Sequence, residues 1–257
     1  MTEQTPRPEE ERKEEGSSTE PRDAAYWARY AETLKVSGVA DGATNINVEG
    51  RRAVGPLQGF GKMWQKTYRV RLAGVEAPPA EVIKTWKENY REFWPKGNVF
   101  YAPLAGITPG EVALISGSLP GGVKLSTGVM VLYADDESFT LMTPQGHPFS
   151  GWITFSSFEE DGDTVAQAQV LMRANDPLYE LGLRMGGHKM EDEMWQETLR
   201  NVAAHFGSRE HVETTLVCVD PKLQWRHYRN VWHNAGIRSA LHMVTAPLRW
   251  RRDRAAR

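Results

Sequence analysis

The chain has 257 residues, of which 40% are hydrophobic, and a formal net charge of −2. This is enough apolar sequence for one large or two small domains, and the balanced charge argues against a general nucleic-acid-binding protein. The ends differ, because residues 1–23 hold 8 acidic and 4 basic side chains, whereas residues 221–257 hold 9 Lys or Arg and one Asp. Such uneven ends are typical of tails.

Three features of the sequence bear on the cellular compartment of the protein. A single cysteine, Cys218, excludes an intrachain disulfide, and we expect it to be buried in the apolar run TTLVCVD. The N-terminus lacks the apolar stretch of a signal peptide, and no run of about 18 apolar residues predicts a spanning helix. The sequence therefore predicts a cytoplasmic protein, with peripheral membrane contact left open.

The first 62 residues are predicted to lie outside the main domain. Residues 1–23 are rich in Glu, Pro and Ser, which predicts a disordered acidic tail. Residues 24–62 are expected to form a short helix, within DAAYWARYAETLK (Asp23–Lys35), and a Gly-rich lead-in. The glycine cluster GPLQGFG is not a phosphate loop, since it lacks the Lys-Ser/Thr pair and precedes a strand.

The organised part begins near Trp64. In WQKTYRVRLAG, alternation places Trp64, Tyr68 and Val70 on one strand face, which Lys66 interrupts. Pro78 and Pro79 then open a helix. Six short strands follow, and turn residues between them predict antiparallel hairpins. They are expected near NVFYAPL, GEVALISGSL, VKLSTGVMVLYA, SFTLMT, GWITFSSFEE and TVAQAQVLMRA.

A long helix is predicted to close this array. Asn175 or Asp176 would cap its start, and Gly207 would end it. Nine residues recur at alternating spacings of three and four, which predicts one stripe down the helix. They are Leu178, Leu181, Met185, His188, Asp192, Trp195, Leu199, Val202 and Phe206.

This order of one strand, an Ala-Pro-Pro helix start, six strands and a long helix resembles the helix-grip fold of the START and Bet v 1-like superfamily. Within it, the segment around the Gly-His-Pro turn of TPQGHPFSGW is similar to an uncharacterised bacterial and plant family, although Phe149-Ser150 stands where that family carries acidic residues. The resemblance implies an α+β protein, in which a curved antiparallel sheet of about seven strands wraps around a long C-terminal helix over residues 63–207. Residues 208–248 would add a strand and a basic helix, and residues 249–257 an Arg-rich tail.

Members of that superfamily bind sterols, phospholipids, polyketides or plant hormones, or cyclise and hydrolyse related compounds. They share no single set of catalytic residues, so the resemblance assigns none here. It does imply a cavity between the sheet and the long helix.

The glycines of LGLRMGGHKMEDEMW are costly inside a helix, and two interpretations remain open for them. Gly182 and Gly186, opposite a small-residue strand face, indicate either tight packing or a kink, or a ligand cavity. For a cavity, the expected lining comes from the helix, the facing strand and one hairpin turn. It consists of Gly182, Met185, Gly186, His188, Trp195, Ala166, Ala168, Val170, Met172 and His147.

His188 and Asp192 are the weak catalytic candidates. At a spacing of four on the apolar stripe they could hydrogen-bond and act as a general base and its orienting group. Alternatively both are half-exposed, beside a solvated acidic face that includes Glu191 and Glu193. His147 is either a turn residue bonded to local backbone or a gate at the cavity mouth.

The remaining chemistry is sparse. No zinc motif or nucleophile elbow is present, so we expect no metal and no cofactor. The basic segment over residues 225–257 could dock on the domain, lie on an anionic membrane or contact RNA. Because the segment has no RNA-recognition motif, we expect no nucleic-acid partner.

The sequence thus predicts a binding module for a hydrophobic small molecule such as a lipid, polyketide or isoprenoid. Two alternatives remain: a cyclase, dehydratase or hydrolase in the same cavity, and a structural or interaction protein at a membrane surface.

Overall fold

The computed structural model describes residues 24–118 and 124–255, with side chains described up to Thr245. The acidic tail predicted over residues 1–23 and the last two residues of the predicted Arg-rich tail lie outside the described residues.

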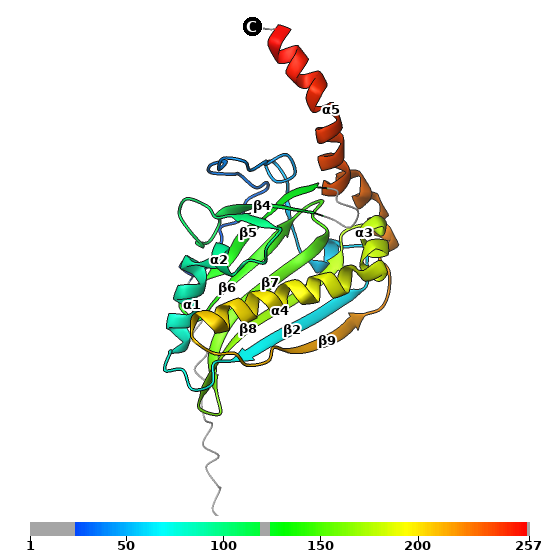
Figure 1. Ribbon diagram of the computed structural model, residues 1–257. Helices are drawn as coiled ribbons and strands as arrows, with labels where there is room; N and C mark the ends of the chain where they lie inside the picture. The colour runs from blue at the N-terminus through cyan, green and yellow to red at the C-terminus, as the bar shows by residue number, and fades with distance from the viewer. Residues whose placement is uncertain (1–23, 119–123, 256–257) are drawn as a thin grey trace, which may run out of the picture.

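One curved antiparallel sheet forms the body of the protein (Figure 1). Its strand order is β3-β4-β5-β6-β7-β8-β2-β9, and the short β1 pairs with β6. The strands are β1 (Ala53–Val54), β2 (Met63–Arg71), β3 (Val99–Tyr101), β4 (Val112–Ser118), β5 (Lys124–Ala134), β6 (Ser138–Pro144), β7 (Phe149–Glu160), β8 (Asp163–Ala174) and β9 (Glu213–Asp220). Every predicted strand is present, and consecutive strands from β3 to β8 pair as hairpins.

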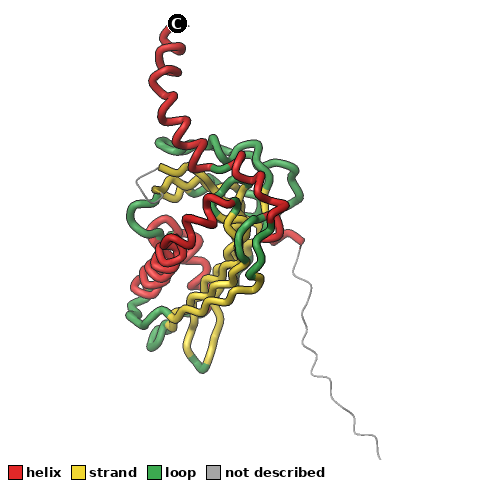
Figure 2. Tube along the Cα trace, turned by 90° about the vertical axis from the view of Figure 1, so that its right-hand side faces the viewer, coloured by secondary structure: helices red, strands yellow, loops and turns green. Residues whose placement is uncertain are grey.

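The inner face of the sheet is covered by α1 (Pro79–Glu88), α2 (Tyr90–Phe93) and α4 (His188–His205). Figure 2 shows the strands as one curved layer with the α4 coil beside it. The main core joins helix and strand residues, with Trp86 packed on Phe139 and Phe155. The predicted fold class, an antiparallel sheet gripping a long helix, is confirmed.

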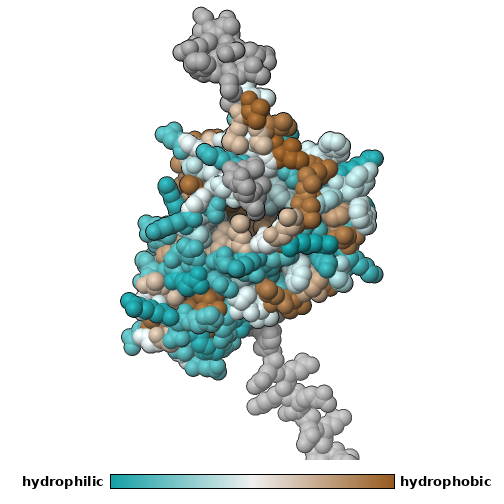
Figure 3. Space-filling view, turned by 45° about the vertical axis from the view of Figure 1, so that its right-hand side comes forward, coloured by the Kyte–Doolittle hydropathy of each residue, from teal (hydrophilic) through white to brown (hydrophobic). Residues whose placement is uncertain are grey.

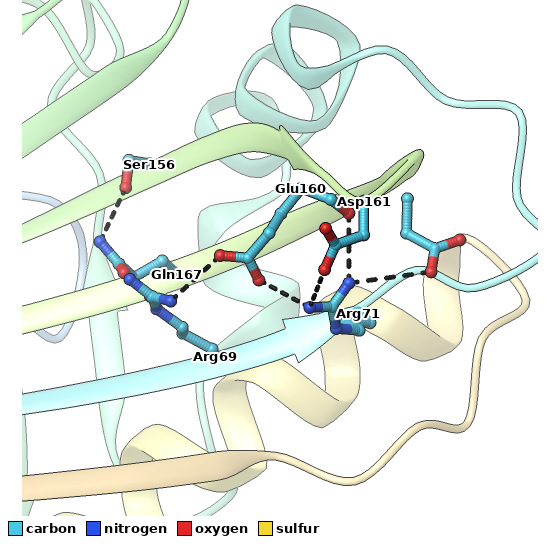
Figure 4. A network of polar contacts seen from close by, with 7 residues as sticks. Arg69, Arg71, Ser156, Glu160, Asp161 and Gln167 are labelled. Atoms are coloured by element: carbon cyan, nitrogen blue, oxygen red, sulfur yellow. Dashed lines mark hydrogen bonds and ion pairs between the residues drawn. The ribbon is translucent and has the colours of Figure 1, made fainter.

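Alternation along β2 decides which side chains enter this core. Lys66, Tyr68 and Val70 are buried on the inner face. Arg69 and Arg71 point outward, where both pair with Glu160 (Figure 4). Ion pairs this exposed contribute little stability. Lys66 differs from these two arginines, because its charged side chain lies on the inner, buried face of the strand.

The predicted single long helix is broken, which corrects the expectation of one stripe from residue 178 to 206. The structure has α3 (Pro177–Gly182), a π-helical turn (Leu183–Gly187) and then α4. Gly186 has a φ of 116°, a conformation that side chains disfavour, and this residue interrupts the helical path. The break turns the first part of the stripe away from the sheet, so that Met185 is 78% exposed. The predicted start is confirmed, because Asp176 accepts hydrogen bonds from Leu178 N and Tyr179 N.

The lead-in packs on the opposite face of the sheet. Its helix is only the turn Ala24–Tyr26, shorter than predicted, because the following backbone pairs with β5 through a Trp27–Tyr133 bridge and the Ala28 N–H. A second buried cluster forms there between the lead-in and strands β4 and β5. Its members are Leu34, Val48, Val112, Leu114 and Met130.

The C-terminal elements extend the domain beyond the predicted boundary at residue 207. Strand β9 pairs with β2 at the sheet edge, and Cys218 is only half-buried there, so the expectation of a buried thiol is wrong. A 3-10 segment (Trp225–His233) and α5 (Ala235–Ala255) follow, and α5 rises from the body of the protein (Figure 1). Most of the predicted Arg-rich tail is the end of this helix.

Candidate ligand cavity

A cavity of about 610 Å³ lies between the sheet, the α3–α4 break and the start of α5. This volume is within the usual range of small-molecule sites. Apolar and aromatic side chains dominate the wall. The aromatic ones are Tyr90, Trp94, Phe149, Trp152, Tyr179 and Trp195.

The helix break helps to shape this space. Gly182 and Gly187 both line the cavity, and a side chain built on Gly182 would meet nothing within 4 Å. Gly186 supplies the predicted kink, whereas Gly182 lies on the cavity wall with open space beside it.

Half of the residues predicted from the sequence lie on this wall. They are Gly182, Trp195, Val170, Met172 and His147.

The other half lie elsewhere. Met185 and Gly186 face away from the wall because of the break. Ala166 and Ala168 are buried further along β8, in the cluster with Leu199, where the sheet packs directly under α4 and leaves no gap. His188 does not line the cavity, because its ring lies against Trp64 at 5.2 Å.

The predicted His188–Asp192 pair is not assembled. Asp192 Oδ1 instead accepts hydrogen bonds from Lys66 Nζ at 2.6 Å and from the Tyr68 hydroxyl at 2.6 Å. Among the described residues, His188 Nδ1 has no hydrogen-bond partner. Burial, together with the charge of Lys66, lowers the pKa of His188 to about 4, so the ring is neutral at physiological pH.

Lys66 instead organises a buried polar cluster that includes Tyr68, Glu191 and Asp192. Its ammonium group lies 2.8 Å from Glu191 Oε2, and the Lys66 and Glu191 side chains are 1% and 4% exposed. Glu191 lines the cavity and is not part of a solvated acidic face, whereas Glu193 is exposed. The sequence signal for this cluster was Lys66 at an inward strand position.

Two carboxylates share one buried ammonium group here, which favours a proton on one of them. Burial raises the pKa of Glu191 to about 7, against the opposing effect of Lys66. Burial also raises the pKa of Tyr68, so its hydroxyl stays protonated and donates to Asp192. Glu191 is therefore the titratable group of the cavity wall whose charge changes near neutral pH.

His147 matches the turn interpretation and also lies on the cavity wall, whereas its role as a gate stays a prediction. Its Nδ1 accepts a hydrogen bond from the backbone N–H of Phe149 at 3.0 Å, as a turn residue would. It also lines the cavity, and burial lowers its pKa to about 4.

The C-terminal segment forms part of the cavity wall, which the sequence did not predict. Asn234 and Ile237 are part of the wall. The segment is anchored to α3, because Asn234 Nδ2 donates to Asp176 Oδ2 at 2.9 Å and the Tyr179 hydroxyl accepts from Gly236 N at 2.9 Å. The start of α5 is thus docked, whatever the rest of the basic segment contacts.

Comparison with known proteins yields likeness in structure only, since no family model and no curated protein matches the chain. Protein Ms6760 from Mycobacterium smegmatis is similar over 55% of this chain and 89% of its own, with 16% identity and a TM-score of 0.41. Ara h 8.0201 is similar over 56% and 97%, with 13% identity and a TM-score of 0.41. The di-domain ARO/CYC StfQ from the steffimycin biosynthetic pathway is similar over 56% and 50%, with 11% identity and a TM-score of 0.41. At these scores the likenesses carry no argument about what this chain binds.

Within the described part of the chain, no helix combines the length and apolar character needed to cross a membrane.

Proposed function

We propose that this protein binds a hydrophobic small molecule in the cavity between the sheet and the α3–α4 break. The observation that carries the proposal is an apolar space of about 610 Å³ walled by aromatic and aliphatic side chains. Each 100 Å² of apolar ligand surface buried there would contribute about 2.5 kcal/mol. Few polar groups face the space. They would orient a ligand whose affinity comes mainly from burial of its apolar surface.

Native mass spectrometry of protein purified from its own host tests this proposal, because a retained ligand adds its mass to the chain. The matched control is Gly182→Trp, which fills the open space beside Gly182. We expect an added mass on the wild type that is absent from the variant. A wild type that carries nothing and does not bind a naphthalene probe such as 1-anilinonaphthalene-8-sulfonate contradicts the proposal.

A second candidate is acid–base chemistry on the bound molecule, as in a cyclase, dehydratase or hydrolase. Glu191 supports it, because this carboxyl group lines the cavity with a pKa of about 7, near the value at which a general acid or base is most effective. Incubating the ligand recovered from the host with wild type and with Glu191→Gln tests it. Product formed by the wild type alone supports catalysis, whereas unchanged ligand from both leaves binding as the function.

The basic C-terminal segment supports a peripheral membrane contact as part of this proposal, in a cytoplasmic protein. On α5, Ile237, Leu241 and Val244 are exposed at helical spacing, and residues 221–257 carry 9 Lys or Arg against one Asp. Figure 3 shows hydrophobic residues gathered on the surface below the end of α5. An amphipathic basic helix of this kind binds anionic lipid surfaces.

Vesicle flotation tests that contact. A chain ending at Thr245 keeps the cavity-lining residues of α5 and removes most of its arginines. We expect the full chain to float with vesicles that contain phosphatidylglycerol and the shortened chain to remain behind. Equal behaviour of the two chains contradicts the contact.

A further inference from the structure

Four polar groups on the cavity wall have no hydrogen-bond partner among the described residues. They are the Tyr90 hydroxyl, the Trp94 and Trp195 indole N–H groups and the Thr127 hydroxyl. The side chains of Tyr90 and Thr127 are almost completely buried. Buried polar groups in proteins are nearly always satisfied, so groups left over beside a cavity indicate a partner that occupies it.

These groups gather at one end of the cavity. The Tyr90 and Trp94 ring centroids are 5.5 Å apart, and both rings contact Phe100, at 4.6 and 5.5 Å. The strand register pairs Phe100 with Ile115, and Ile115 with Thr127. Paired residues point to the same face of a sheet, so Thr127 projects from the inner face two strands away from Phe100.

Each of these groups can donate a hydrogen bond. An indole N–H can only donate, and burial raises the pKa of Tyr90, which keeps its hydroxyl protonated. The surrounding rings supply flat apolar surface, since Trp94 also contacts Trp195 at 5.8 Å. A plain hydrocarbon chain would leave all these groups unsatisfied, whereas an oxygen on a ring system can accept from the Tyr90 hydroxyl and the Trp94 indole N–H.

We infer that the ligand is an oxygenated aromatic or alicyclic ring compound whose carbonyl or hydroxyl oxygen accepts hydrogen bonds from Tyr90 and Trp94. This inference rests on the proposed binding of a hydrophobic molecule and names its class. Tyr90, Trp94 and Thr127 are thus specificity-determining residues, which select a ring oxygen over plain hydrocarbon.

Two probes of similar size test the inference: 2-acetylnaphthalene, which carries the oxygen, and 2-isopropylnaphthalene, in which a methyl group replaces it. Affinities are measured by displacement of 1-anilinonaphthalene-8-sulfonate. The main variant is Tyr90→Phe, which removes one hydroxyl, and Thr127→Val is a second variant of nearly unchanged shape. Tyr101→Phe is the matched control, because the Tyr101 hydroxyl bonds to Gly42 O outside the cavity.

We expect Tyr90→Phe to lower the affinity for 2-acetylnaphthalene about tenfold, which corresponds to the loss of one hydrogen bond. The affinity for 2-isopropylnaphthalene should not change. Thr127→Val should act in the same direction, and Tyr101→Phe should alter neither affinity. The urea midpoint of ligand-free Tyr90→Phe should rise, because a buried unpaired hydroxyl has been removed, and this also establishes that the variant folds.

The outcomes separate the two claims. If the wild type binds neither probe, the proposed function fails together with the inference. If it binds both and neither the Tyr90 nor the Thr127 variant changes the affinity for 2-acetylnaphthalene, binding stands and the inferred ring oxygen is overturned.

Discussion

Replacing Lys66 by methionine should be among the most destabilising single changes in this protein. The Lys66 ammonium group is buried and lies 2.8 Å from Glu191 and 2.6 Å from Asp192. Methionine has a similar length but no charge, so the variant leaves two carboxyl groups in the core without their counter-ion. Removing one partner of a buried ion pair typically costs about 3–5 kcal/mol of unfolding free energy.

The loss should depend on pH in a defined direction. The pKa of Glu191 rises from an ordinary 4.5 to about 7 on folding, so its contribution to stability is complete below about pH 4.5 and is lost as pH rises past 7. Without Lys66, whose charge lowers this pKa, Glu191 should hold its proton to still higher pH. Below about pH 6, Glu191 is protonated in the variant and carries no buried charge, so the destabilisation is smaller. The full loss of unfolding free energy should therefore appear near pH 8.5.

Urea unfolding followed by tryptophan fluorescence, at about pH 5.5 and 8.5, measures both effects. Lys189→Met is the matched control, because Lys189 lies on α4 but is 82% exposed, with its nearest carboxylate at 3.8 Å. It should change the unfolding free energy by less than about 0.5 kcal/mol. A loss below about 1 kcal/mol for Lys66→Met at the higher pH would refute the claim that Lys66 neutralises a buried cluster.

Three further predictions concern the same region. In the wild type, the unfolding free energy should differ by about 3 kcal/mol between pH 4.5 and 8, and Glu191→Gln should remove this difference. Urea unfolding of both proteins measures it, and parallel pH profiles would contradict the pKa shift. Gly182→Ala should stabilise the fold by about 0.4–1 kcal/mol, because Gly182 has helical backbone angles and open space beside it. Gly186→Ala should destabilise the fold by about 1 kcal/mol or more, because Gly186 has a φ of 116°. A shift of the thermal unfolding midpoint in the same direction for both variants would contradict this pair of predictions. Asp176→Ala should lower the unfolding free energy by about 1–2 kcal/mol through the lost helix cap. It should also speed amide exchange over residues 234–240, because Asn234 is anchored to Asp176; unchanged exchange would show that Asp176 does not hold that segment.

Local signals in the sequence were sufficient for the order of the elements. Alternation marks the strands, turn residues mark the hairpins, and Pro79 and Asp176 mark helix starts, because each signal depends on neighbours in the chain. The same signals placed Val170, Met172 and Trp195 toward the interior. They were also enough to predict a sheet that grips a helix.

Tertiary structure alone decided the chemistry of the interior. Lys66 and Glu191 are 125 residues apart, and nothing local to either residue reveals the other. The positions of Asn234 and Ile237 on the cavity wall, and of Tyr90 and Thr127 on the same wall, likewise depend on segments brought together by packing. Periodicity reports which face of an element is buried, but the partner that it meets there is set by how distant elements are placed around the shared core.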